Sequence, residues 1–148
     1  MKRTIFILVP SLHPTGPVKG AYALANALAD TRRVVLVTLK PGPGVDAPLH
    51  PLVEQRFLEG VAGGWRGRLQ AYRAMLQEAG GRAKVVSISI CLSADLVNRY
   101  CRKEAVIYTS VRGNLLRNYR HDYGLPGVMF AVGHLMALRS FEIGRAHV

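Results

Sequence analysis

The sequence predicts an α/β fold, a Rossmann-like three-layer α/β/α arrangement with a mainly parallel sheet. Short apolar runs alternate with segments of helical periodicity along the chain. Residues 4–9 (Thr-Ile-Phe-Ile-Leu-Val) lack polar alternation, which suits a central strand buried on both faces. A Gly/Pro loop at residues 10–17 joins this run directly to a helix. Strands followed by helices in this way predict right-handed βαβ units and therefore a parallel sheet.

The remaining strands and helices follow from the same periodicities. The expected strands are apolar runs rich in β-branched residues, at residues 33–39, 53–58 (a weak edge strand), 84–90 and 105–109. Helices with apolar residues on one side are expected at residues 17–29, 67–79, 94–101 and 125–139. The polar and basic segment at residues 113–123 is expected to form a short helix. Together they give the strand and helix alternation of an open α/β sheet.

Two helix starts and one helix face can be predicted in more detail. Gly16 is expected as the N-cap of the first helix, with Pro17 at the first helical position, and Ser93 as the N-cap of the third helix. The last helix is expected to have one apolar face formed by Val128, Val132, Leu135 and Met136, with Met129 and Met136 in the core and His134 packed among apolar neighbours.

Composition indicates one globular domain with anionic partners. The 148 residues are 49% hydrophobic, and 20 Lys and Arg against 9 Asp and Glu give a net charge of +11. This excess fits nucleic acid, phosphorylated ligands or an anionic membrane surface, although an arginine-rich genome would produce part of the same bias. No motif of the common nucleic-acid-binding folds is present, which argues against nucleic acid.

The cysteines, the histidines and the N-terminus suggest no metal site and a cytoplasmic location. Cys91 and Cys101 form no Cys-x-x-Cys pair, and the five histidines lack zinc-site spacing. The first apolar run stops at Pro10 without a cleavage site, and no run reaches the roughly 18 apolar residues of a spanning helix. Peripheral contact with the inner face of the membrane stays open.

The last seven residues have a different character from the rest. Residues 142–148 (Glu-Ile-Gly-Arg-Ala-His-Val) resemble the translation of a common sequencing adapter. We therefore expect one Rossmann-like domain at residues 1–141, a non-native tail at 142–148, and a natural gene that continues further. The alternative is a genuine polar C-terminus.

Two loops at one edge of the predicted sheet carry the candidate binding residues. The loop before Gly16 places a helix N-terminus above the first strand, which attracts phosphate, and Lys19 adds a cation one turn later. The loop matches neither of the common Gly-rich nucleotide fingerprints, so a plain strand-to-helix turn is the alternative. Arg112 and Asn114 follow the last strand on the same edge, where an arginine binds phosphate or carboxylate bidentately.

The chain resembles the N-terminal, acceptor-side half of a GT-B glycosyltransferase of the family-4 kind. The resemblance covers roughly residues 1–141 and rests on the order and spacing of residues 10–17, 37–39, 93–95, 109–114, Tyr119 and 122–124. It implies two facing Rossmann-like domains, of which this one mainly binds the acceptor. The other would bind the nucleotide-sugar through an acidic pair that this chain does not reach.

The resemblance also implies an activity and roles for particular residues. It implies transfer of a sugar from a nucleotide-sugar to a glycan or lipid-linked acceptor, in cell-envelope or capsular polysaccharide synthesis. Configuration would be retained, without metal or further cofactor. Arg112 stands where many relatives have a catalytic histidine, and the donor phosphates and the acceptor would be bound by Thr15, Gly16, Lys19, Asp95 and Asn114. Relatives often have histidines after the third clear strand, and this chain has Ile88-Ser89-Ile90-Cys91 there.

Two other functions remain open at this point. One is a stand-alone flavodoxin-like nucleotide binder. The other is a basic, non-enzymatic interaction module, because Arg112, Arg117 and Arg120 interleave with Tyr119 and Tyr123. Asp95 has an alternative explanation too, as a favourable charge near a helix N-terminus.

Overall fold

The computed structural model describes residues 2–110 and 115–139. Within them the strands are β1 (Thr4–Val9), β2 (Val34–Thr38), β3 (Val53–Phe57), β4 (Val85–Ser89) and β5 (Val106–Thr109). The helices are α1 (Gly16–Ala29), α2 (Gly64–Glu78), α3 (Leu92–Arg99), α4 (Leu115–Tyr123) and α5 (Leu125–Leu138). Every expected element is present, including the edge strand β3, and α2 begins three residues earlier than predicted.

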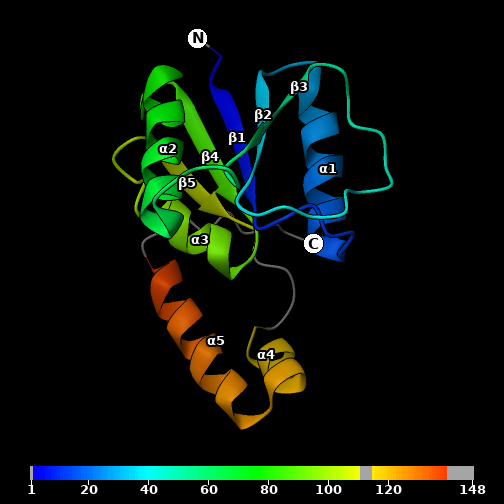
Figure 1. The fold of residues 1–148 in the computed structure, drawn as a ribbon, viewed down its shortest axis with the longest axis vertical. Helices are drawn as coiled ribbons and strands as arrows, with labels where there is room; N and C mark the ends of the chain where they lie inside the picture. Colours follow the sequence, from blue (N-terminus) through cyan, green and yellow to red (C-terminus); the bar gives the residue numbers. More distant parts are fainter. Residues whose placement is uncertain (1, 111–114, 140–148) are drawn as a thin grey trace.

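The strands form one parallel sheet in the order β3-β2-β1-β4-β5, which confirms the predicted fold class (Figure 1). β1 is central and pairs with both β2 and β4, so that Ile5 lies opposite Val34 on one side and Val86 on the other. The chain leaves β1 toward β2 and β3 and later returns to the other side for β4 and β5. In such sheets the point where the strand order reverses is the usual ligand position, at the carboxyl ends of the strands.

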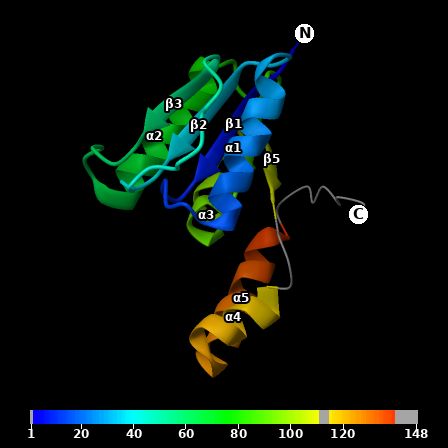
Figure 2. The same cartoon turned by 90° about the vertical axis from the view of Figure 1, so that its right-hand side faces the viewer.

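Each face of the sheet has its own apolar cluster. Ile7 and Val9 of β1 pack with Tyr22 and Ala25 of α1 on one face. Phe6 and Leu8 point to the other face, where α2 and α3 cover the sheet. Figure 2 shows α1 in front of the sheet and α2 behind it. Because successive strand residues point to opposite faces, the unbroken apolar run of β1 supplies both clusters.

The last two helices form a hairpin beyond the carboxyl ends of the strands, as both views show (Figures 1 and 2). A single residue lies between α4 and α5, and Gly127 brings them into close contact. A Cβ atom at Gly127 would lie 1.9 Å from the carbonyl oxygen of Tyr119, so a larger residue would force the helices apart. No helix in the described residues is long and apolar enough to cross a membrane.

Both predicted helix starts require correction. Thr15 is the N-cap of α1, and the N–H of Lys19 donates to its carbonyl over 2.9 Å, so Gly16 and Pro17 are the first two helical residues. Cys91 is the N-cap of α3, which places Ser93 inside the first turn. Cys91 has a φ of 75°, and this positive-φ conformation, which is uncommon for a residue other than glycine, turns the chain from β4 into the helix before Ser93 is reached.

The predicted apolar face of α5 is also wrong. Val132, Leu135, Met129 and Met136 are all exposed, whereas the buried residues are Gly127, Ala131, His134, Ala137 and Leu138. The inward side is therefore built from small residues and a histidine. Close packing against Tyr119 and a hydrogen-bonded partner for His134 decide the orientation, and hydropathy does not reveal either.

Candidate functional site

A cavity of about 250 Å³ lies where the strand order reverses. Its wall comes from the start of α1 (Pro17), the turn after β4 (Ile90, Cys91, Leu92), Asp95 of α3, Ser110 after β5, and the hairpin (Leu115, Asn118, Tyr119, Asp122, Tyr123, His134). The carboxyl ends of parallel strands and the last two helices thus border one partly open space with a mixed polar and apolar wall.

Among the polar residues that line this cavity, Asp95 is the most buried. Asp95 is 1% exposed, and its Oδ1 accepts hydrogen bonds from the Ser89 hydroxyl at 2.6 Å and the Thr109 hydroxyl at 2.7 Å. Its Oδ2 lies 2.6 Å from Nε2 of His134, which is 4% exposed. Burying a carboxylate is costly unless it is paired and hydrogen-bonded, and these three contacts fulfil that condition.

Tyr119 continues this chain of hydrogen bonds to the cavity wall. Its hydroxyl lies 3.2 Å from Nδ1 of His134, and the two rings meet edge to face. When His134 donates from Nε2 to Asp95, Nδ1 is free to accept the proton of the phenol. Burial raises the pKa of Tyr119, and Tyr123 and Asp95 raise it further, so the phenol is neutral at ordinary pH. The result is an ordered series, Asp95–His134–Tyr119, that ends at the cavity.

A second buried network fixes the base of the site. The Ser87 hydroxyl donates to Oδ1 of Asn98 at 2.6 Å and lies 2.6 Å from the Tyr72 hydroxyl. The Asn98 amide nitrogen contacts the carbonyl oxygens of Ser87 and Tyr108, both at 3.2 Å, and the Ser89 hydroxyl at 3.1 Å. Asn98 thus ties α3 to β4 and β5, which holds Asp95, one turn earlier on α3, in its place.

The structure brings only part of the predicted site together. Thr15, Gly16 and Lys19 are exposed at the start of α1, and among the described residues the cavity wall includes Pro17 but none of these three. Asp95 lines the cavity through its buried carboxylate. Arg112 and Asn114 lie outside the described residues, so their predicted roles stay predictions.

His134 is the main functional candidate that sequence reasoning did not identify as one. It is 39 residues from Asp95, and neither belongs to a spacing motif. The one available signal was its position as the only ionisable side chain among the apolar residues of α5. A polar residue on an otherwise uncharged helix needs a partner if it is buried, and here that partner is Asp95.

The thiol in the cavity wall is not activated. Burial raises the pKa of Cys91, and the charge of Asp95 raises it further, so the thiol stays protonated at neutral pH. Across residues 2–110 and 115–139, no group of three or more His, Cys, Asp or Glu side chains is arranged to hold a metal ion.

The comparisons with known proteins support the fold. No family model and no curated protein matches the sequence. The chain is similar to the structure of Phytolacca americana UGT2 complexed with UDP-2fluoro-glucose and pterostilbene, with a TM-score of 0.50 and 20% sequence identity. The match covers 82% of this chain and 34% of that one, so the chain spans about a third of that protein's length. This chain is therefore a Rossmann-like α/β domain with the fold of one half of a GT-B glycosyltransferase.

Proposed function

We propose that the chain is the acceptor-side half of a two-domain glycosyltransferase. The enzyme would move a sugar from a nucleotide-sugar to a glycan or lipid-linked acceptor, in the synthesis of cell-envelope or capsular polysaccharide. The observation that carries this proposal is the cavity at the strand-order reversal, with the Asp95, His134 and Tyr119 side chains in its wall, in a domain with this fold. Binding at that position is the general rule for open α/β sheets.

In this proposal the cavity binds a hydroxyl group of the acceptor. Tyr119 and Asn118 present neutral polar groups there, and Asp122 adds a carboxylate. These are the side chains that hydrogen-bond sugar hydroxyls, and His134 and Asp95 act as positioning residues for the Tyr119 hydroxyl. Pre-organised partners reduce the entropy cost of binding.

The donor's diphosphate would lie at the N-terminus of α1. Thr15, Gly16 and Lys19 are exposed there, and Arg112 and Asn114 come after β5 in the sequence. Arg112 would stabilise the charge of the leaving diphosphate. Retention of configuration and independence of metal are part of the same proposal, by resemblance. The second half of the enzyme would supply the remaining donor contacts.

The direct test compares this chain with a version extended by its natural continuation. We expect turnover of a nucleotide-sugar only from the extended protein, because the proposal assigns the other wall of the cleft to the second domain. In that protein Arg112→Ala should lower kcat by roughly a hundredfold or more, as expected for loss of a transition-state charge contact. Arg102→Ala, an exposed arginine of another cluster, is the matched control. Equal effects of the two substitutions would remove Arg112 from the site.

Calorimetry with UDP-glucose on the isolated chain separates this proposal from its main rival. The acceptor-side half should bind UDP-glucose weakly or not at all. Tight binding would instead identify a stand-alone nucleotide binder. In the extended enzyme, Tyr119→Phe should raise the acceptor KM by roughly tenfold, the equivalent of about one lost hydrogen bond, with little change in kcat. An unchanged KM would exclude the phenol from acceptor binding.

A further inference from the structure

Helix α5 carries an exposed apolar stripe that the proposed sugar transfer does not use. Leu125, Met129, Val132 and Met136 follow one another at intervals of four, three and four residues, which places them on one side of the helix. Their side chains are 77%, 80%, 46% and 61% exposed, respectively. His134 and the small residues occupy the opposite, buried side. Contiguous exposed apolar residues of this kind mark an interaction surface.

The hairpin that bears the stripe is cationic outside it. From residue 115 to 139 the sequence has three arginines, Arg117, Arg120 and Arg139, and one acidic residue, Asp122, which lies 3.2 Å from His121. Residues 125–138 contain no Lys, Arg, Asp or Glu. The surface therefore combines an uncharged apolar stripe with a basic border.

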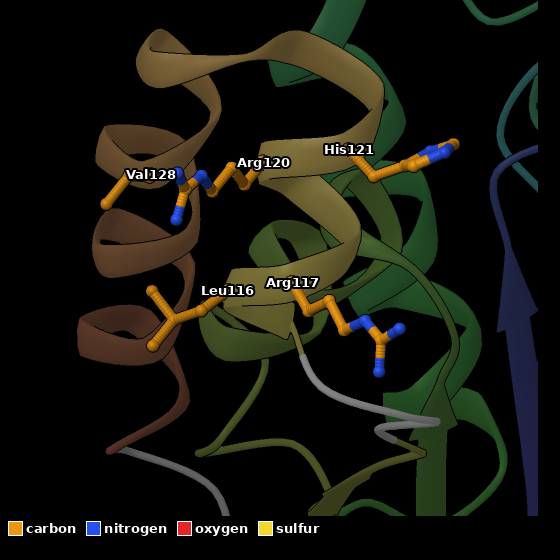
Figure 3. Close-up of a pocket in the computed structure, with 5 residues that line it drawn as sticks. All are labelled: Leu116, Arg117, Arg120, His121 and Val128. Atoms are coloured by element: carbon orange, nitrogen blue, oxygen red, sulfur yellow. The ribbon is translucent and has the colours of Figure 1, made fainter.

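An open cleft beside the stripe shows the same combination of properties. It has a volume of about 650 Å³ and is lined by Leu116, Arg117, Arg120, His121 and Val128. Figure 3 shows Arg120 directed toward α5, beside Val128, while Arg117 and His121 point the other way. A guanidinium group beside an aliphatic side chain, as at Arg120 and Val128 (Figure 3), suits a ligand that has an anionic head and an apolar tail.

We propose that the α4–α5 hairpin docks on a lipid bilayer that contains anionic phospholipids. The stripe would enter the boundary between head groups and acyl chains, with α5 parallel to the membrane plane. The guanidinium group of Arg120 (Figure 3) would contact lipid phosphates. A bilayer fits better than a protein partner because every member of the stripe is apolar, whereas protein interfaces outside obligate assemblies are only slightly more than half apolar.

This inference goes beyond the proposed function and can fail separately from it. Docking on vesicles requires no sugar transfer, no nucleotide-sugar and no second domain. If both proposals hold, docking places the enzyme next to a lipid-linked acceptor, because Tyr119 and Asp122 of the cavity belong to the hairpin that touches the bilayer.

Co-sedimentation with vesicles tests the proposal on the chain as it stands. We expect the chain to pellet with vesicles of phosphatidylcholine mixed with phosphatidylglycerol, and much less with phosphatidylcholine alone. Met129→Glu should lower the partition coefficient at least tenfold, because a carboxylate then faces the apolar layer. Arg120→Gln should lower it about fivefold, and only on the anionic vesicles. Leu52→Glu, at an exposed leucine before the opposite edge strand β3, should leave binding unchanged.

Three results would overturn the proposal, provided that circular dichroism shows each variant to be folded. The first is equal vesicle binding by Met129→Glu and the unsubstituted chain. The second is a concentration-dependent dimer that Met129→Glu abolishes, which would make a second copy the occupant of the stripe. The third is a large gain in vesicle binding on deletion of residues 140–148, which would make that segment the occupant.

Discussion

The sheet region (residues 4–109) and the α4–α5 hairpin (residues 115–138) are held in place by different means. The sheet has two buried apolar clusters, one on each face. The hairpin has no buried residue in α4, and α5 buries three small residues, one leucine and His134. Although α5 is the more apolar of the two hairpin helices, most of its large apolar side chains face solvent. Apolar content alone therefore does not identify a core-facing surface, because a buried hydrogen bond can orient a helix against its hydropathy.

The largest expected effect concerns the apolar packing of the sheet region, compared with an exposed leucine of the hairpin. Leu8→Ala removes a fully buried side chain from the sheet and should lower the free energy of unfolding by about 2–5 kcal/mol. Leu125→Ala, at a leucine of the hairpin that is 77% exposed, should change it by less than about 0.5 kcal/mol. Urea denaturation measures both. Similar losses would mean that Leu125 is covered in solution.

The next effect concerns the polar contact between the two regions. Asp95→Asn removes the charge that faces His134, Ser89 and Thr109. It should lower the free energy of unfolding by about 1.5–3 kcal/mol. Asp46→Asn, at an exposed loop carboxylate, is the control and should be neutral within about 0.5 kcal/mol. We expect amide exchange to accelerate in α5 more than in β1. Uniform acceleration would show that the hairpin and the sheet unfold as one unit.

Two glycines of α5 offer a matched pair. Gly127→Ala places a methyl group against the carbonyl oxygen of Tyr119 and should destabilise the hairpin by about 1–3 kcal/mol. Gly133→Ala meets no atom within 4 Å and should stabilise the helix by about 0.5–1 kcal/mol. Amide exchange in α4 and α5 reports both changes. Destabilisation by Gly133→Ala would indicate a neighbour on that side of α5.

The smallest effect belongs to an ion-pair cluster at the sheet edge. Hydrogen bonds from Arg33 and then Arg56 lower the pKa of Glu54 in the folded protein. The stabilisation of the folded protein by the charged Glu54 carboxylate is therefore fully present above the unfolded pKa, about 4.3. It is lost as the pH falls through the lower folded pKa. We expect these ion pairs to raise the free energy of unfolding by at most about 1 kcal/mol, because their side chains are partly exposed. Glu54→Gln should remove this part of the acid dependence of stability, and an identical pH profile would mean that the pairs contribute nothing.

The sequence predicted the sheet region better than the hairpin, for physical reasons. Residues 4–9 could be assigned because a strand buried on both faces needs no tertiary information beyond its apolar run. Asp95 could be named, but its partner could not, because a contact over 39 residues leaves no local pattern. The orientation of α5 depends on that contact and on Gly127, so the hydropathy of Met129 and Met136 pointed to the wrong side.

The central position of β1 has a consequence for how the chain is made. β1 is the first strand to leave the ribosome, yet one of its two neighbours, β4, begins only at Val85. At about 5–20 residues per second, the intervening chain takes roughly 4–15 s to synthesise. During that time the backbone of β1 lacks its second partner, so the nascent protein is exposed to misassembly well before the cavity can form.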